Sequence, residues 1–244
     1  MLATSGGLLG ASLLCRPVFS QNEGAVQKPL KILVASGHPD DAESGCGGTI
    51  CKFTALGHEV AVLYLTRGEA GVKGKTHQEA AEMRSAEAIE ACRVMKAKPL
   101  FAGQIDGNTI INKSEFEKIA KMIEKEAPDL VFTQWPIDTH PDHRVVSNLV
   151  YNGWNWFRRD EKRAFDLYYY EVLTGEQTQN FHPTHYVDIT ETAALKKEAT
   201  MKHACQNPSE WYPHHEKMGE FRGLESQWDC KYAEAYVRQG FSEV

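Results

Sequence analysis

The sequence has 244 residues, 42% of them hydrophobic, and a formal net charge of -6 at pH 7, which is enough chain for one substantial core. Charges of both signs are interleaved, as in residues 158–163, so no basic stripe is present and we expect no nucleic-acid partner. The six cysteines include no Cys-x-x-Cys pair, which argues against a disulfide framework and favours small buried thiols.

Residues 1–27 form an N-terminal segment that carries a short apolar run, Leu8–Cys15. The following Val18–Ser20 suits signal-peptidase cleavage before Gln21. The run is too short to span a membrane as a helix, so we expect no stable membrane span. Because a basic n-region is missing, two interpretations stay open. The segment is the remainder of an export signal of a periplasmic or secreted protein, or it is an N-terminal arm of a cytoplasmic protein.

Residues 28–244 are expected to form a single domain. Short apolar runs alternate with longer amphipathic ones, which predicts an α/β, Rossmann-like three-layer fold with a mainly parallel sheet flanked by helices. The elements expected in the first part of this domain are a strand at 30–35, a glycine-rich turn to Gly48, a helix at 49–56, a strand at 59–66, a helix opened by a capping box at 76–79, a strand at 99–104, a helix opened by a second capping box at 114–117 and a strand at 129–134.

In the helix that follows residue 76, Arg84 and Glu87 are three residues apart and are interpreted as a local ion pair. The C-terminal part is expected to contain a helix to about Phe157, strands near 168–172 and 186–189, helices at 193–205 and 227–237, and a loop between 206 and 222.

Two similar tetrapeptides each follow a predicted strand, His-Pro-Asp-Asp at 38–41 and His-Pro-Asp-His at 140–143. The carboxyl ends of the strands are where open α/β sheets bind their ligands, so we expect the two motifs to meet in space. Imidazoles and carboxylates are ligands of zinc, and a catalytic zinc keeps three protein ligands and one open position. The pair of motifs therefore predicts a metal site with its proton-transfer groups.

The first motif has two interpretations. An irregular backbone around Pro39 can direct the carboxylates of Asp40 and Asp41 differently, so that one binds metal and the other holds water. Alternatively both carboxylates cap the following helix and His38 is a core histidine. The glycines within residues 45–48 bring backbone amides near a ligand, but they do not match the Gly-x-Gly-x-x-Gly pattern, which disfavours a nucleotide site.

The second motif is expected to open a helix. Pro141 suits the first helical position, which makes His140 the cap residue and places Asp142 and His143 in the first turn. The two histidines are three residues apart and can face one pocket. The carboxylate of Asp142 either complements the helix dipole or accepts a hydrogen bond from an imidazole and fixes its tautomer.

Four segments resemble motifs of one family: residues 38–43, 47–49, 66–69 and 140–143. The family is the LmbE-like, or PIG-L, group of zinc-dependent N-deacetylases, and the resemblance runs from about Lys28 to at least Val150. Its enzymes remove acetyl groups from N-acetylglucosamine units in phosphatidylinositol glycans, thiol cofactor precursors and chitin disaccharides. The resemblance implies an enzyme that removes the N-acetyl group of a GlcNAc-type sugar or glycoconjugate.

The resemblance also implies roles for individual residues. His38, Asp41 and His143 would bind zinc, although such a ligand set also accepts Fe²⁺ or Co²⁺. Asp40 would be the general base that takes a proton from the metal-bound water, whose pKa zinc brings toward ~7.

Further roles concern the substrate side of the pocket. His140, oriented by Asp142, would stabilise the tetrahedral oxyanion or pass a proton to the leaving amine. Arg67 would line the substrate side, or else it is a solvated loop arginine. His214 and His215, next to two aromatic residues, would form a lip against which a sugar ring stacks, or else a surface loop.

Two other functions stay open from the sequence. One is a zinc amidase that acts on a non-sugar amide or thiol conjugate, and an export signal would favour glycans over this alternative. The other is a metal-dependent sugar-binding module without turnover. Asp40 discriminates against the binding module, because a binder needs metal ligands but no general base beside them.

Overall fold

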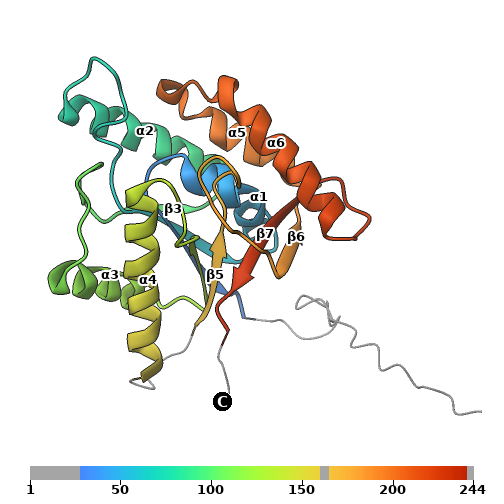
Figure 1. The fold of residues 1–244 in the computed structure, drawn as a ribbon, viewed down its shortest axis with the longest axis horizontal. Coiled ribbons are helices and arrows are strands. Elements are labelled where there is room, and N and C mark those ends of the chain that lie inside the picture. Colours follow the sequence, from blue (N-terminus) through green and yellow to red (C-terminus); the bar gives the residue numbers. More distant parts are fainter. Residues whose placement is uncertain (1–27, 160–164, 241–244) are drawn as a thin grey trace, which may run out of the picture.

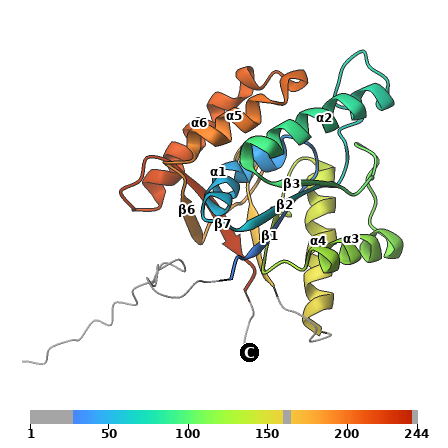
Figure 2. The same cartoon turned by 180° about the vertical axis from the view of Figure 1, so that it is seen from behind.

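The computed structural model describes residues 28–159 and 165–240, so the predicted export signal lies outside the described residues. Seven strands of the described chain form one sheet in the order β3-β2-β1-β4-β5-β7-β6, with helices on both faces (Figures 1 and 2). The strands are β1 (Lys31–Ser36), β2 (Glu59–Tyr64), β3 (Lys98–Phe101), β4 (Leu130–Gln134), β5 (Asp166–Tyr170), β6 (His185–Asp188) and β7 (Ala233–Arg238). The helices are α1 (Asp41–Ala55), α2 (His77–Met95), α3 (Lys113–Glu126), α4 (Pro141–Arg159), α5 (Ala193–Met201) and α6 (Pro208–Glu225), with a 3₁₀ turn η1 (Ala204–Gln206).

The sheet is mainly parallel, as predicted. The five strands β1 to β5 pair in parallel, whereas β7 runs antiparallel to both β5 and β6. Successive side chains of a strand point to opposite faces, and both faces of this sheet are covered. On β1, Ile32 and Val34 join a core with α1, α2 and α5, while Leu33 and Ala35 join a core with α3 and α4. The predicted three-layer α/β fold is therefore confirmed.

The position of β1 creates the place where a site can form. Both β2 and β4 pair with β1, so the order of strands reverses there and the carboxyl ends of β1 and β4 lie side by side. Open α/β sheets bind ligands at such a switch point. The two motifs predicted to meet follow directly after these two strands.

The first helix begins earlier than predicted. Residues 41–48 were expected to form a turn, but they are the first half of α1. The glycines serve close packing rather than a turn: a Cβ atom on Gly48 would lie 2.7 Å from the Cβ of Ile189, and one on Gly45 would lie 2.7 Å from the ring of Tyr170. Glycine lowers the intrinsic stability of a helix. Here the glycines are nevertheless found in a helix, because only small residues let α1 approach the sheet so closely.

The C-terminal third differs most from the prediction. Residues 227–237 were predicted as a helix, but residues 233–238 are β7, which lies between β5 and β6. The predicted loop at 206–222 is mostly α6, whose first residue is Pro208. The Glu234 carboxylate helps to hold β7 in this position, because it accepts the N–H groups of Gly48 and Thr49 from α1 at 3.0 and 2.8 Å. Long-range pairing overrides the local helical pattern.

Helix capping was predicted correctly at one of two places. Thr76 caps α2, with the Glu79 N–H donating to its hydroxyl at 3.2 Å and the Glu79 carboxylate accepting the Thr76 N–H at 2.8 Å. For α3 the predicted cap at Ser114 is wrong. The cap is Asn112, whose side-chain oxygen accepts the Glu115 N–H at 2.9 Å.

We expect Gly48→Ala to lower the free energy of unfolding by about 1–3 kcal/mol, because the added methyl group overpacks the contact with Ile189. Gly219→Ala is the matched control inside α6, since its Cβ would meet only ordinary contacts at 3.5 Å or beyond. There alanine should stabilise the helix by up to about 1 kcal/mol. Urea unfolding of the metal-free proteins measures both changes, and equal stabilities of the two variants would contradict the packing role of Gly48.

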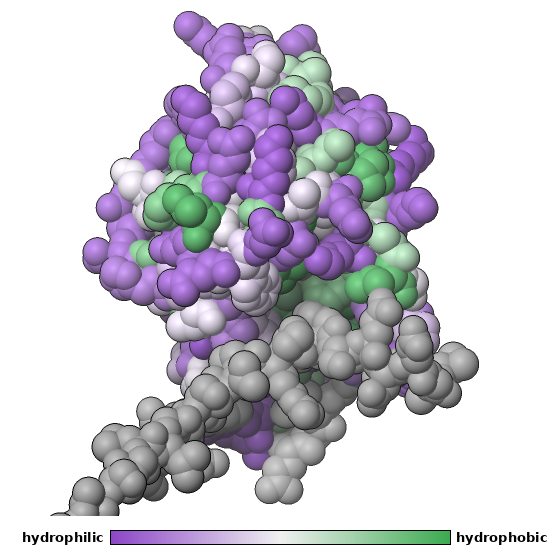
Figure 3. Space-filling view, turned by 90° about the vertical axis from the view of Figure 1, so that its right-hand side faces the viewer, coloured by the Kyte–Doolittle hydropathy of each residue, from purple (hydrophilic) through white to green (hydrophobic). Residues whose placement is uncertain are grey.

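Among the described residues, no helix is both long and apolar enough to cross a membrane. The face shown in Figure 3 is mostly hydrophilic, and its apolar patches are separated by hydrophilic side chains where coloured atoms are visible. Separate apolar side chains of this kind are normal for a protein surface.

Candidate metal centre and active site

The site lies at the adjacent ends of β1 and β4. The side-chain oxygen of Gln134, the last residue of β4, accepts the N–H of Gly37 at 2.7 Å and so ties the two strand ends together. The chain then continues from Gly37 through His38 into α1, and from Gln134 to α4, which begins at Pro141 as predicted. The two motifs meet in space, as the sequence indicates.

The carboxylate of Asp41 lies between two imidazoles. Its Oδ2 is 3.2 Å from Nδ1 of His38, and its Oδ1 is 3.3 Å from Nε2 of His143. All three residues are buried. One nitrogen of each ring and the carboxylate between them therefore point to a common region.

The other nitrogen of each ring also faces a carboxylate. Nε2 of His38 is 3.1 Å from Asp142 and 3.2 Å from Asp106, and Nδ1 of His143 is 3.1 Å from Asp138. A carboxylate on the outer nitrogen fixes the tautomer of an imidazole and raises its basicity as a metal ligand. Each ring thus has one nitrogen held by an outer partner and one directed inward.

These contacts shift the pKa values of the groups involved. Burial alone lowers the pKa of His38, but hydrogen bonds to Asp106, Asp142 and Asp41 outweigh it and raise that pKa well above the usual value. Burial also lowers the pKa of His143, yet the charge of Asp41 and the bond to Asp138 raise it to about 9. Burial raises the pKa of Asp41, whereas the charge of His143 lowers it further, so this carboxylate is ionised. The surrounding carboxylates stabilise positive charge at this place.

Asp40 has an unusual backbone. It precedes α1 with φ of 106°, a left-handed conformation that is rare outside glycine and often marks a functional position. Its Oδ2 accepts a bond from Nη2 of Arg84 at 2.9 Å, and its N–H donates to Glu43 at 3.2 Å. Burial raises the pKa of Asp40 to about 6, although the charge of Arg84 opposes this shift. Arg84 therefore holds the carboxylate of Asp40, whereas the two imidazoles contact that of Asp41.

Asp142 contacts a different imidazole from the one expected. Its carboxylate was expected to orient His140, but it accepts from Gly107 N–H at 2.8 Å and Thr109 Oγ1 at 2.5 Å and faces His38. Its contact with His140 is through its backbone N–H, which donates to Nδ1 at 3.3 Å. The loop after β3 supplies the donors that hold the Asp142 carboxylate toward His38. The expectation that this carboxylate orients His140 is therefore wrong.

His140 lies against both other site histidines. Its ring is stacked on that of His143, with centroids 4.7 Å apart, and is edge-on to that of His38 at 4.6 Å. It is half-buried, and burial together with the charges of His38 and His143 lowers its pKa below the usual value. A third imidazole is therefore placed beside the two that share Asp41.

The donor set fits a divalent metal ion. Two groups have ligand atoms within 4.8 Å of one another, namely His38, His140 and His143, and His38, Asp106, His140 and Asp142. Asp41 belongs to neither group, but its two oxygens approach the inner nitrogens of His38 and His143 to within 3.3 Å. Several buried carboxylates need a compensating cation, and nitrogen with oxygen donors suits a borderline metal.

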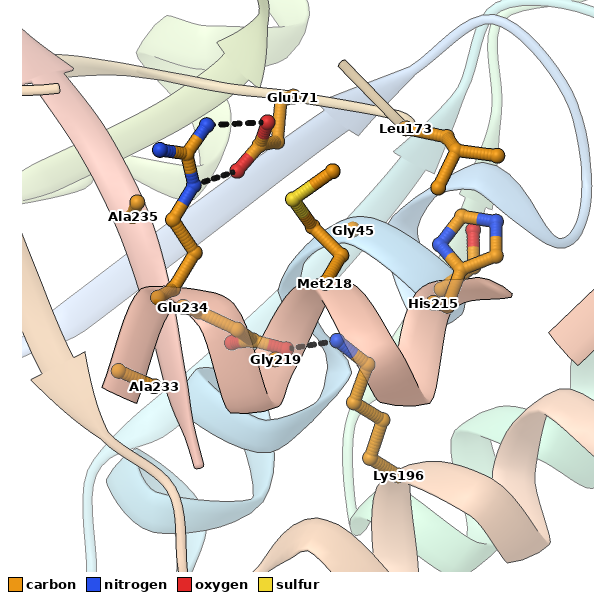
Figure 4. A pocket seen from close by; sticks show the side chains of 12 residues that line it. Gly45, Glu171, Leu173, Lys196, His215, Met218, Gly219, Ala233, Glu234 and Ala235 are labelled. Atoms are coloured by element: carbon orange, nitrogen blue, oxygen red, sulfur yellow. Dashed lines mark hydrogen bonds and ion pairs between the residues drawn. The ribbon is translucent and has the colours of Figure 1, made fainter. Parts of the chain in front are cut away.

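The remaining predicted residues lie further out. Arg67 follows β2 at the same edge of the sheet, where it is 38% exposed and its Nε lies 3.4 Å from Glu69. His214 is an exposed residue of α6, 4.0 Å from Glu176. His215, on the same helix, faces a small cavity that Gly45 and Leu173 also line (Figure 4). The two histidines therefore belong to a helix, and the expectation of a loop is wrong.

The cavity beside His215 is bounded by two ion pairs. Arg222 pairs with Glu171 at 2.6 Å, and Lys196 pairs with Glu234 at 2.7 Å (Figure 4). Burial and the charge of Lys196 lower the pKa of His215 to about 3, so its imidazole is neutral. These pairs join α5 to β7, and α6 to the residue that follows β5, next to the first turn of α1.

Sequence reasoning missed several residues of the site. Asp106 and Gly107 follow β3 and could have been found, because an Asp-Gly pair after a strand lies at the same edge of the sheet as the two motifs. Arg84 carried no such signal and was interpreted as a partner of Glu87. That interpretation is wrong, because Arg84 contacts Asp40 whereas Glu87 accepts the N–H of Cys205 at 2.9 Å.

Comparison with known proteins agrees with this geometry. The chain is 29% identical over 220 residues to diacetylchitobiose deacetylase of Thermococcus kodakarensis. The matched region covers 84% of this chain and 81% of that protein. The structure of N,N'-diacetylchitobiose deacetylase from Pyrococcus horikoshii superposes with a TM-score of 0.75 at 25% identity, covering 89% of this chain and 88% of the other. A 4-carboxy-2-hydroxymuconate hydratase from Pseudomonas putida KT2440 has a TM-score of 0.77 at 21% identity over 88% of this chain and 98% of the other, a likeness of fold alone.

The family comparison covers the part of the chain that holds both motifs. The model of the GlcNAc-PI de-N-acetylases matches residues 33–154, from β1 to α4. That range contains the three site histidines together with Asp40 and Asp41. The chain belongs to the PIG-L family of N-deacetylases.

Proposed function

We propose that this protein is a zinc-dependent hydrolase that removes the acetyl group from a GlcNAc-type sugar or glycoconjugate and releases acetate and a free amine. The observation that carries the proposal is the carboxylate of Asp41 between the inner nitrogens of His38 and His143, with Asp40 next to it in the chain. The diacetylchitobiose deacetylases among its relatives support a sugar substrate.

The proposed metal ligands are Nδ1 of His38, the carboxylate of Asp41 and Nε2 of His143. This set is favoured over the three-histidine group because it leaves the outer nitrogens bonded to Asp142 and Asp138. Zinc suits these donors, and Fe²⁺ or Co²⁺ are the other ions they accept. When bound, such an ion polarises the amide carbonyl and lowers the pKa of water.

The chain's own residues then move the protons. Asp40 takes a proton from the attacking water as the water oxygen forms a bond to the carbonyl carbon. The amine nitrogen receives a proton, returned by Asp40 or passed on through His140, as its bond to that carbon breaks. His140 donates a hydrogen bond to the oxyanion of the tetrahedral species or a proton to the leaving amine. Asp142 positions His38, and through its backbone N–H it also contacts His140. Arg67 is the proposed substrate-side residue, and it lies beyond the carboxyl end of β2.

Acetate release from a panel of N-acetylated sugars tests this function. We expect release from GlcNAc or its oligosaccharides, loss of activity after chelation, and recovery when Zn²⁺ is returned. Release only from non-sugar amides would favour the amidase alternative. Metal-dependent sugar binding without acetate would favour the binding module, and water addition to a carbon–carbon double bond would indicate hydratase chemistry instead.

A further inference from the structure

A buried arginine reaches the proposed general base from a separate helix. Arg84 lies on α2, and its side chain is 4% exposed. Its Nη2 donates to the carboxylate of Asp40 at 2.9 Å and to the carbonyl oxygen of Pro39 at 2.6 Å. One guanidinium nitrogen thus contacts both the side chain of Asp40 and the backbone immediately before it.

The peptide between Pro39 and Asp40 is held at both ends. Arg84 binds its carbonyl oxygen, and the carboxylate of Glu43 accepts its N–H at 3.2 Å. This peptide sets the backbone angle of Asp40, which is the strained φ of 106°. A left-handed aspartate persists only where its surroundings hold it, and these two charged groups do so.

Glu43 is itself fixed from behind. Its Oε1 accepts from the hydroxyl of Tyr64 at 2.6 Å and lies 3.1 Å from Nε2 of His203. Glu43, Tyr64 and His203 are all fully buried. The support of Asp40 therefore comes from α1, β2 and α2, and from His203 just before η1.

Two glycines make room for the guanidinium. A Cβ atom on Gly68 would lie 2.4 Å from Nη1 of Arg84, and one on Gly71 would lie 2.3 Å from the same atom. The N–H of Gly71 donates to the carbonyl of Gly68 at 3.1 Å, so the two glycines form a turn that wraps the guanidinium. An apolar side chain of similar volume could fill this space, but it could not bond the carbonyl of Pro39 and the carboxylate of Asp40. Packing alone therefore does not account for an arginine here.

We propose that Arg84 is a positioning residue that holds Asp40 in its left-handed conformation and aims the carboxylate at the reacting water, with the turn at Gly68 and Gly71 as its cradle. This inference rests on the proposed role of Asp40 as general base. A base displaced by about 1 Å is expected to slow the chemical step by roughly 100-fold, because catalysis depends on the geometry of the reacting groups.

The test compares Arg84→Gln, Arg84→Lys and the wild-type enzyme by kcat, KM, metal content and the visible spectrum of the Co²⁺-substituted protein. We expect Arg84→Gln to lose about 100-fold in kcat with unchanged KM, metal content and Co²⁺ spectrum. Arg84→Lys should recover part of the loss because it keeps a charged donor. Arg93→Gln is the matched control, since it removes an exposed arginine from the same helix.

Gly71→Ala tests the same idea without changing any charge. Its methyl group would displace the guanidinium, so kcat should fall while KM and the Co²⁺ spectrum stay unchanged, and this variant decides the matter if Arg84→Gln does not fold. Wild-type kcat in the folded Arg84→Gln or Gly71→Ala enzyme would overturn the inference, as would loss of the metal from either. If the wild-type enzyme releases no acetate from any N-acetylated sugar, the proposed function fails. If Asp40→Asn is fully active, the base role of Asp40 fails and the inference with it; if Asp40→Asn is inactive while Arg84→Gln is normal, only the positioning role fails.

Discussion

The Asp40→Asn enzyme is expected to keep its metal ion and lose turnover by about 10²–10⁴-fold, the range attributed to a general base. Asparagine has the same shape and tolerates the left-handed backbone of position 40, so the fold and the contact with Arg84 should persist. Only the ability to take a proton is removed. Measurement of kcat for acetate release, together with metal content, checks this expectation.

A distant carboxylate serves as the control for Asp40. Asp166→Asn removes a half-exposed carboxylate that pairs with Arg238 at the start of β5, and its kcat should equal that of the wild type. Wild-type turnover in a metal-loaded Asp40→Asn enzyme would show that Asp40 is not the base.

The His143→Ala enzyme is expected to lose both metal and activity, whereas His140→Ala should keep the metal and lose activity only. His143 contributes an inner nitrogen beside Asp41, so its loss should weaken metal binding more than the roughly 10–100-fold that loss of an outer partner costs. Removal of His140 takes away the proposed donor to the oxyanion, which is worth about 10²–10³-fold in kcat. Competition with a chromophoric chelator measures the affinities.

The same pair of variants distinguishes the two possible ligand sets. If His140→Ala releases metal as readily as His143→Ala, then the three-histidine group holds the ion instead of the set that contains Asp41. His77→Ala, at the exposed start of α2, should behave as the wild type in both assays.

The sheet was predictable from the sequence where the signal was local. The apolar runs of β1, β2 and β4 and the capping box at Thr76 all correspond to elements of the structure. The early start of α1 was not predictable, because glycine at position 48 serves a close contact with Ile189, a residue that is distant in the chain. For the same reason β7 resembled a helix, since its partners β5 and β6 decide its conformation.

The site was predictable to the extent that its residues share motifs. The meeting of the two motifs followed from strand ends and from the resemblance to the PIG-L family. The place of Asp106 after β3 was a usable signal for the site, but the imidazole that Asp106 or Asp138 contacts did not follow, because both residues lie in loops whose course only the folded chain reveals. Arg84 was missed because spacing along a helix suggested Glu87 as its partner, whereas its contact lies on another element.

The location of β7 has a consequence for how the protein is made. It is the last strand of the described chain, yet it lies inside the sheet, and its Glu234 holds two amides of the first helix. A nascent chain that has not yet released residues 233–238 from the ribosome would expose the open edges of β5 and β6. Domains begin to fold from the N-terminus during synthesis, but here the helix that carries Asp41 gains this anchorage only after residues 233–238 have emerged.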